Sequence, residues 1–400
     1  MTDADRIRSQ AELDLAAQLR KEPRISEAIR QREAFEKDKH LGIRRSLLAT
    51  ALRLTRDIAP EAYDIVDTCK QRLGVVDEVE VFVYPSPVFN AAMPRGESGR
   101  SFVMLSSSLF EALDRDELLF VVGHELGHHH YQHHEIPLEI LADPNRPVPA
   151  ALAIRLRAWQ RFAEISSDRA GLWCAESFSA AARSLFKLSS GLSQAPTEAQ
   201  VAAFVQQATE LYREVEQSEE PILHRDWLAS HPFSPMRLKA AEAFMASEAF
   251  GADGRSLADV DLEVSDLMTL MEPNYIEEDT EEAEHMRRLV LAMGVGIAKA
   301  NGVIEPSEME ALTTLLGRRH LPAEISAEAL EADLPRRIED GRGKVRRARR
   351  AQVIRDVALV ARSDGRVDEV ERALLYRFAA DLEVDGSVVD QALVEPVALD

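Results

Sequence analysis

The hydrophobic positions along the chain separate long helical segments from one short strand-forming segment. Up to Pro60, apolar side chains recur at helical spacing among charged residues, which predicts amphipathic helices that pack against the next domain. Residues 79–84 and 101–106 instead form short runs of β-branched and aromatic side chains, which predict two strands. The turn-rich loop 90–99 between them favours a small β-meander.

The predicted strands are followed by a mainly helical region. Asp114, with Glu117 three residues later, has the pattern of a capping box and predicts a helix that runs to Pro137. A second long helix is expected over residues 150–176, and further helices are expected to about Phe250. The segment after that ends in a nearly uninterrupted acidic run, which is typical of a linker.

The C-terminal part of the chain repeats itself. Residues 298–308 align with residues 361–371 at a constant offset of 63, which predicts a duplicated helical hairpin. The Asn-Gly pair at 301–302 and the Asp-Gly pair at 364–365 are suited to end a helix, because glycine adopts the left-handed conformation readily. Both loops lack the ladder of oxygen ligands of an EF-hand, which excludes that calcium site.

These elements predict an α+β fold that is mainly helical, with an all-α C-terminal domain. A chain of 400 residues is long enough for two to three domains, each with its own core. The expected divisions are N-terminal amphipathic helices over 1–60, a central domain with the small β-meander over 61–250, an acidic linker over 251–284 and a helical domain over 285–400.

Charge and cysteine content restrict the expected partners and compartment. The formal net charge of −21 opposes the phosphate backbone, so nucleic acid is not expected as a partner. Cys69 and Cys174 are too few for a disulfide framework, which favours a reducing compartment. The longest apolar run, residues 289–298, is too short to span a membrane, and the first residues lack the pattern of a secretory signal. A cytoplasmic protein without an integral membrane segment is expected.

His124, Glu125 and His128 form an H-E-x-x-H motif inside the helix predicted from Asp114. Residues four apart share one helical face, so the imidazoles of His124 and His128 can bind one metal ion, while Glu125 is turned toward a water on that ion. The divalent ion would activate this water, and Glu125 would act as the general base that passes the proton to the leaving amine. The motif therefore predicts metal-dependent hydrolysis of peptide bonds.

A catalytic zinc ion needs a third protein ligand, and two residues compete for this place. His134 lies ten residues after His124, as in the metzincins, but that geometry requires a helix-breaking glycine at the position of Tyr131. Glu164 lies in the next helix, and Asp168 shares its face four residues later. The sequence favours Glu164 as the ligand and Asp168 as the acceptor for the outer N–H of a ligand histidine, most simply His124. The remaining histidines of the cluster, interpreted as a solvated helix face, are His129, His130, His133 and His134.

These motifs resemble peptidase family M48, a gluzincin family that includes the CAAX prenyl proteases and the HtpX-type heat-shock proteases. The resemblance covers residues 70–245 and rests first on H-E-x-x-H followed by E-x-x-x-D-R-x-G. It also rests on an Asn-Ala element at Asn90 after a strand end, on the strand 101–106 before the active-site helix, and on an H-P-x4-R element that begins at His231 and ends at Arg237.

The resemblance implies a zincin-type endopeptidase with one zinc ion per chain, held by His124, His128 and Glu164. In this family the counterpart of His231 faces the site, where its N–H would stabilise the oxyanion, and Arg237 would orient His231 or the substrate. Both would therefore join Glu125 as catalytic residues. The implied substrate is a protein or peptide in extended form, held by main-chain pairing as at a sheet edge. The residues expected to hold it are Asn90, Ser101, Val103 and Leu105.

The duplicated C-terminal segment resembles the TerB-like domain associated with tellurite resistance and stress operons. This resemblance implies an interaction or regulatory module that binds a protein partner. Two alternatives to a working peptidase remain open. In one, the zinc-binding fold is latent or chaperone-like, with His231 as a fourth ligand that closes the site, and the C-terminal domain mediates stress-related interactions. In the other, the C-terminal domain is the working part, and the peptidase half anchors it.

Overall fold

The computed structural model divides the chain into two compact units. It describes residues 3–38, 42–97, 99–142, 148, 150–217, 231–268, 280–300, 302, 306–316, 321, 326–363 and 367–394. The first unit comprises Met1–Leu141, Ala158–Glu210 and Ser230–Met268, and the second comprises Ala142–Arg157, Leu211–Ala229 and Thr269–Asp400. The sheet and all the candidate site residues belong to the first unit.

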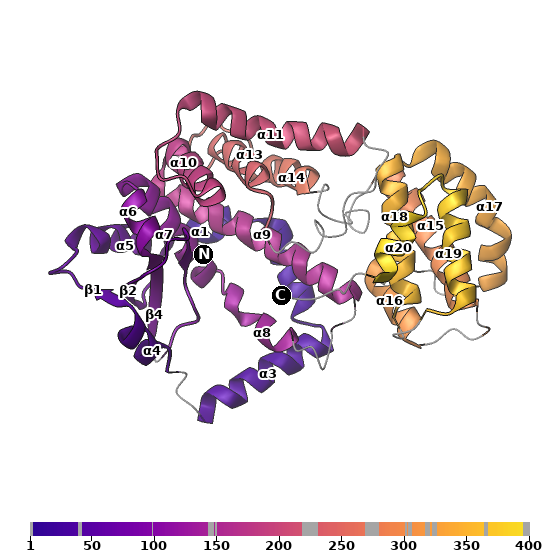
Figure 1. Cartoon of the computed structure of the whole chain (residues 1–400), viewed down its shortest axis with the longest axis horizontal. Coiled ribbons are helices and arrows are strands. Elements are labelled where there is room, and N and C mark those ends of the chain that lie inside the picture. The colour runs from indigo at the N-terminus through magenta and orange to yellow at the C-terminus, as the bar shows by residue number, and fades with distance from the viewer. Residues whose placement is uncertain are drawn as a thin grey trace. The chain divides into compact units, whose positions relative to one another are not determined.

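The sheet consists of β1 (Leu52–Leu54), β2 (Glu78–Tyr84), β3 (Ala91–Ala92) and β4 (Arg100–Ser106), in the spatial order β1-β2-β4-β3. Figure 1 labels β1, β2 and β4. Strands β2 and β4 run parallel, whereas β1 is antiparallel to β2 and β3 is antiparallel to β4. The expected β-meander is therefore wrong. Parallel neighbours need a long connection, and residues 85–99 supply it, with the edge strand β3 inside it.

The N-terminal region is helical as expected, except for its last residues. Its helices are α1 (Asp3–Ile7), α2 (Gln10–Leu19), α3 (Pro23–Asp38) and α4 (Ile43–Thr50). Leu52 and Leu54, which fit the helical spacing, form β1 instead, because pairing with Val83 and Val81 of β2 satisfies their backbone groups. The buried carboxylate of Glu80 on β2 binds Arg44 at 2.7 Å, which ties α4 to the sheet.

Helix α7 (Arg115–His130) is the helix predicted from Asp114. Its capping box is formed, since the Asp114 side chain accepts the N–H of Glu117 at 2.9 Å and the Glu117 side chain accepts the N–H of Asp114 at 2.8 Å. Glu117 is also completely buried and accepts a hydrogen bond from Lys187 of α10 (Phe178–Ser190) at 2.8 Å. These contacts fix where the helix that carries the H-E-x-x-H motif begins.

The other end of α7 differs from the prediction, because the helix stops at His130 instead of Pro137. Gln132 has a left-handed backbone with a φ of 59°, and His133–Glu135 form the short 3-10 helix η1. The chain therefore turns here although position 131 is tyrosine and not glycine, because the next residue, Gln132, adopts the left-handed conformation.

Helix α9 (Ala150–Ala175) lies against α7 at glycines. A Cβ atom added to Gly127 would lie 2.7 Å from the Cβ of Ala170, and one added to Gly171 would lie 2.5 Å from the carbonyl oxygen of Phe120. The two backbones can approach this closely only because these positions carry hydrogen atoms. This close packing brings the acidic residues of α9 beside the histidines of α7.

The other helices of the first unit pack around this pair. Helix α5 packs on α7, α10 packs on α7 and α13, and α13 packs on α14. Their bounds are α5 (Pro60–Leu73), α6 (Ser107–Ala112), α8 (Leu138–Leu141), α11 (Glu198–Gln217), α13 (Ser234–Met245) and α14 (Leu257–Met268), with the last residues of α11 in the second unit.

The predicted acidic linker over 251–284 contains ordered helix at both ends. Helix α14 buries Val260, Val264 and Met268, so these residues belong to the first unit. At the other end, Thr280 caps α15 (Glu281–Ala298) by accepting the N–H of Ala283. Apolar residues at helical spacing outweigh the acidic composition of 257–268, and the acidic residues 277–279 lie outside the described residues.

The C-terminal region is all-α, as expected. Helices α15 (Glu281–Ala298), α16 (Pro306–Leu316), α17 (Ala327–Lys344), α18 (Arg347–Ala361), α19 (Glu369–Asp381) and α20 (Ser387–Val394) share one apolar core (Figure 1). Helices α15 and α18 end 63 residues apart, and α16 and α19 begin 63 residues apart, so the sequence repeat is a repeat of helical hairpins. Gly302 has the expected left-handed φ of 94°, whereas Asn301, Asp364 and Gly365 lie outside the described residues.

Helix length and hydropathy also bear on the membrane. None of the helices in the described ranges combines the length and the apolar character needed to cross a bilayer.

Candidate metal centre

Two helices of the first unit bring three ligand-type side chains together. His124 and His128 lie on one face of α7, with 3.1 Å between their Nε2 atoms. The carboxylate of Glu164 on α9 faces both imidazoles, at 3.6 Å from the Nε2 of His124 and 3.2 Å from the Nε2 of His128. Among the described residues, these three form the one group of His, Cys, Asp and Glu side chains that is arranged to hold a metal ion.

The spacing of these donor atoms fits one zinc ion. Ligand atoms about 2.0–2.1 Å from a tetrahedral zinc ion lie about 3.4 Å from one another, close to the observed separations. Two imidazoles and one carboxylate are also the donor set of a catalytic zinc site that leaves one position open. His134 is not part of this group, so the expected choice of Glu164 over His134 agrees with the geometry.

A second layer of contacts holds the three side chains. The Nδ1 of His124 lies 2.9 Å from Oδ1 of Asp168, which is the pairing expected from the sequence. Arg237 on α13 donates to both oxygens of Asp168, at 2.6 and 2.8 Å, and its Nη1 lies 3.3 Å from Glu164. The guanidinium therefore contacts both buried carboxylates.

Burial and neighbouring charges shift the pKa values of these side chains in opposite directions. Burial alone would raise the pKa of Glu164, but the charge of Arg237 and the hydrogen bond from His128 hold it well below its ordinary value. For Asp168, burial is likewise outweighed by Arg237, and the pKa is lowered. Burial lowers the pKa of His124, but its hydrogen bond to Asp168 and the charge of Glu164 outweigh this and raise the pKa. Both carboxylates are therefore ionised at neutral pH.

Glu125 and His231 are the remaining residues expected to act in catalysis. Glu125 follows His124 in α7 and is partly exposed. The Nε2 of His231 lies 3.5 Å from Oε1 of Glu164, and 64% of its side chain is exposed. This exposure leaves the imidazole within reach of a molecule that enters from solvent. The structure thus brings together the expected metal ligands, Asp168, Arg237 and His231.

The predicted substrate-binding strand does not have the expected accessibility. The side chains of Ser101, Val103 and Leu105 are buried, at 2% exposure or less. Strand β4 pairs with β2 along its length, and β3 covers its other edge at Met104 and Leu105. The edge strand is β3, which directly follows Asn90 and contacts α7. Asn90 itself donates from Nδ2 to the hydroxyl of Tyr84 at 2.9 Å.

The histidines interpreted as a solvated helix face have specific partners. His129 lies 2.7 Å from Asp77, and His130 lies 3.1 Å from Asp5. His133 is buried, and its Nδ1 lies 2.8 Å from the Nδ1 of His128. The expectation of a solvated face is wrong for His133, because the turn after α7 folds it back against the ligand histidine.

The sequence analysis did not single out two further features of the site. Glu12 of α2 is completely buried beside His133, and no local pattern marks it, since α2 and α7 are far apart in the chain. The close contact between α7 and α9 occurs at Gly127 and Gly171. These glycines are visible in the sequence, but their role in packing is evident only once the two helices are known to be neighbours.

Comparison with known proteins finds a matching family model for each of two regions of the chain. Residues 60–245 match the model of peptidase family M48, and residues 287–393 match the model of the tellurite resistance protein TerB. The chloroplastic plastoglobule-localized metallopeptidase 48 of Arabidopsis thaliana is 30% identical over 142 residues, which cover 33% of this chain and 41% of that protein. The chain thus aligns with less than half of that relative's length. No solved structure matches the chain.

Proposed function

Residues 60–245 of this chain belong to peptidase family M48 and residues 287–393 to the TerB family, and we propose that the chain is a zinc-dependent endopeptidase of protein or peptide substrates. The observation that carries this proposal is the convergence of His124, His128 and Glu164 at the meeting point of α7 and α9. A metallopeptidase of the same family among the relatives supports it.

His124, His128 and Glu164 would hold one zinc ion, through the two Nε2 atoms and the carboxylate. When bound, zinc polarises the scissile carbonyl group and lowers the pKa of a coordinated water to about 7. Asp168 would hold the Nδ1–H of His124 and so keep the Nε2 lone pair directed at the ion. Arg237 would act as a positioning residue, because its contacts are with the two carboxylates.

Glu125 would act as the general base. Its position next to His124 places it on the helix that carries the ligands, and its carboxylate is accessible from solvent. It would take a proton from the attacking water and deliver it to the leaving amine nitrogen, so that the peptide bond breaks to give an acid and an amine. His231 would donate its N–H to the oxygen of the scissile carbonyl as negative charge develops there.

The substrate would lie along β3. This two-residue strand is one of the two edges of the sheet and contacts the active-site helix α7, so an extended peptide that paired with Ala91 and Ala92 would pass the metal site. Asn90, at the start of this strand, would help to hold the peptide. Ser101, Val103 and Leu105 would act by supporting β3 from within the sheet.

The TerB domain would serve as the interaction module for a protein partner. Cys69 and Cys174 are both buried.

The test is the zinc content of the full chain together with its proteolysis of an unfolded protein such as casein. The proposal expects one zinc ion per chain, and cleavage that stops on chelation and returns when zinc is added back. A chain that binds no zinc would contradict the proposed site. A wild-type chain with one zinc ion and no cleavage would contradict the proposed activity and favour the latent zinc-binding alternative.

A further inference from the structure

The turn that ends α7 brings a second histidine onto the proposed ligand His128. The left-handed residue Gln132 reverses the chain, and His133 then lies with its Nδ1 2.8 Å from the Nδ1 of His128. The imidazole rings meet edge to face, with 4.9 Å between their centroids. His128 therefore contacts Glu164 through its Nε2 and contacts His133 through its Nδ1.

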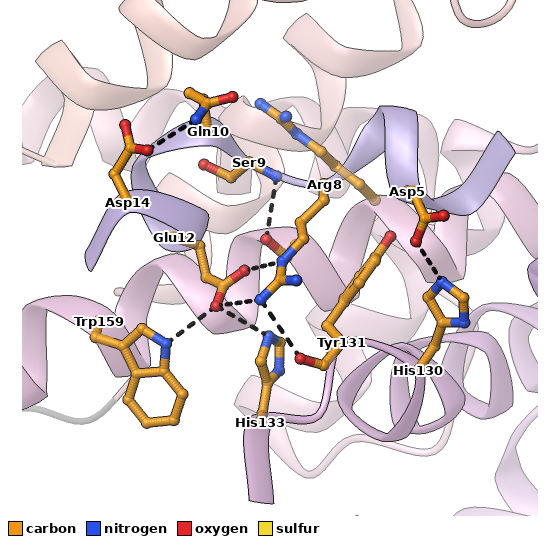
Figure 2. A network of polar contacts seen from close by, with 12 residues as sticks. Asp5, Arg8, Ser9, Gln10, Glu12, Asp14, His130, Tyr131, His133 and Trp159 are labelled. Atoms are coloured by element: carbon orange, nitrogen blue, oxygen red, sulfur yellow. Dashed lines mark hydrogen bonds and ion pairs between the residues drawn. The ribbon is translucent and has the colours of Figure 1, made fainter. Parts of the chain in front are cut away.

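His133 is backed in turn by a carboxylate from the N-terminal helices. Glu12 of α2 is completely buried, and its Oε1 lies 3.5 Å from the Nε2 of His133. Trp159 donates its indole N–H to the same oxygen at 3.0 Å, and Arg8 donates to the carboxylate through Nε and, at 2.9 Å, through Nη2 (Figure 2). This arrangement fixes where the carboxylate points.

The position of α2 is secured independently of Glu12. The hydroxyl of Tyr131 donates to the carbonyl oxygen of Ala4 at 2.9 Å, and the N–H of Ser9 donates to the hydroxyl of Ser166 at 3.2 Å. Figure 2 shows Arg8, Ser9 and Glu12 beside Tyr131 and His133, which follow α7, and beside Trp159 of α9. The carboxylate is thus delivered to His133 by a docked element of the same unit.

Only one arrangement of protons satisfies all these contacts if the Nε2 of His128 binds a metal ion. A neutral His128 then carries its proton on Nδ1 and donates it to the Nδ1 of His133. His133 must accept there, so its own proton lies on Nε2, the ring nitrogen that is 3.5 Å from Oε1 of Glu12. Glu12 is thus the carboxylate nearest to this proton, although the separation is longer than that of an ordinary hydrogen bond.

We propose that Glu12 is a positioning residue of the metal site, which acts through His133 to hold His128 in the tautomer and orientation that bind zinc. The inference rests on the proposed zinc-binding function. It extends the usual carboxylate–histidine–metal arrangement by one histidine. Glu12 lies outside residues 60–245, so the N-terminal helices supply a part of the site that the matched peptidase region does not contain.

The charges around Glu12 define its role more closely. Arg8 pairs with Glu12 and also lies over the ring of Tyr131, with its guanidinium carbon 5.2 Å from the ring centroid. The pair of Arg8 and Glu12 is neutral as a whole, so it adds little net charge at His133. Its contribution is local, since Oε1 of Glu12 lies 3.5 Å from the Nε2 of His133.

The experiment measures the zinc affinity of the full-length chain by competition with a chelator, for the wild type and for Glu12→Gln. The amide introduced by Glu12→Gln could donate a hydrogen bond to the Nε2 of His133, which would place the proton of His133 on Nδ1. The Nδ1 of His133 could then no longer accept the proton of His128. We expect zinc affinity to fall about 10–100-fold. The matched control is Asp14→Asn, an exposed residue of the same helix with the same change in charge, which should keep wild-type affinity.

A spectroscopic measurement makes the test independent of any variant. In ¹⁵N-histidine spectra of the zinc-loaded wild type, His133 should carry its proton on Nε2 and accept at Nδ1, with its signals identified by their loss in His133→Gln. A proton on the Nδ1 of His133 would overturn the inference. So would equal zinc affinity of the wild type and a folded Glu12→Gln chain. A wild type that binds no zinc would instead contradict the proposed function.

Discussion

Asp168 holds His124 from the side of the imidazole opposite the Nε2 that faces Glu164, with its Oδ1 2.9 Å from the Nδ1 of His124. The same buried carboxylate accepts two hydrogen bonds from Arg237. One carboxylate thus fixes a proposed metal ligand and anchors a third helix, α13, to the site. The metal centre and the packing of α7, α9 and α13 are therefore coupled.

Replacement of this carboxylate should weaken the metal site. In Asp168→Asn the acceptor for His124 is no longer charged and Arg237 loses its bidentate partner. We expect zinc affinity to fall about 10–100-fold and the midpoint of thermal unfolding to decrease. Chelator competition and calorimetry measure these two quantities. Wild-type zinc affinity in the Asp168→Asn chain would show that other groups orient His124.

Glu125→Gln should separate metal binding from catalysis. The amide keeps the size of the side chain but cannot take up a proton, so we expect one zinc ion per chain and a fall in kcat of about 10²–10⁴-fold. Zinc content and casein cleavage check this, with Glu139→Gln as a control at an exposed position of α8. Cleavage by Glu125→Gln at the wild-type rate would disprove its role as general base.

His231→Ala distinguishes an oxyanion donor from a metal ligand. Its Nε2 lies 3.5 Å from Glu164, and its side chain is largely exposed, so both roles are within reach. As an oxyanion donor, its loss should lower kcat about 10²–10³-fold and leave zinc affinity unchanged. Steady-state kinetics and chelator competition on the same preparation distinguish the two roles. If His231 were a fourth zinc ligand, its loss would weaken zinc binding.

Gly127→Ala should disturb the metal centre through helix packing alone. The new methyl group would lie 2.7 Å from the Cβ of Ala170, so α7 and α9 must separate and carry Glu164 away from the histidines. We expect unfolding to cost about 1–3 kcal/mol less, as for other overpacked cores, and zinc to bind more weakly. Gly251→Ala, where an added Cβ meets no atom within 4 Å, is the control. Unchanged stability and zinc affinity in Gly127→Ala would contradict this packing.

Glu80 should contribute to the loss of stability in acid. Hydrogen bonding to Arg44 holds its pKa below the ordinary value of 4.5, although burial acts in the opposite direction. This stabilisation is fully present above pH 4.5 and is lost as the pH falls through the lower pKa of the folded state. The free energy of unfolding should therefore fall less steeply with acidification in Glu80→Gln than in the wild type.

Denaturant unfolding at a series of pH values measures this difference. Glu78→Gln, on the same strand but exposed, provides the matched control, and it should follow the wild-type curve. Parallel curves for Glu80→Gln and the wild type would show that the ion pair with Arg44 adds nothing to stability.

Local patterns in the sequence determined much of the site. The spacing of His124 and His128, and that of Glu164 and Asp168, places each pair on one helical face whatever else the chain does. The capping box at Asp114 and the repeat at an offset of 63 were likewise decided by backbone geometry and periodicity. These features depend on neighbours within one or two turns, which is why they could be predicted.

Tertiary structure alone decided which distant residues meet. The parallel pairing of β2 with β4 removed the expected meander, and the pairing of β4 with both β2 and β3 left β3 as the edge strand on that side of the sheet. The left-handed turn at Gln132 and the buried carboxylate of Glu12 gave His133 its place behind His128. Such contacts arise when packing removes apolar surface and polar groups from water, and that free energy depends on residues far apart in the chain, which no local pattern records.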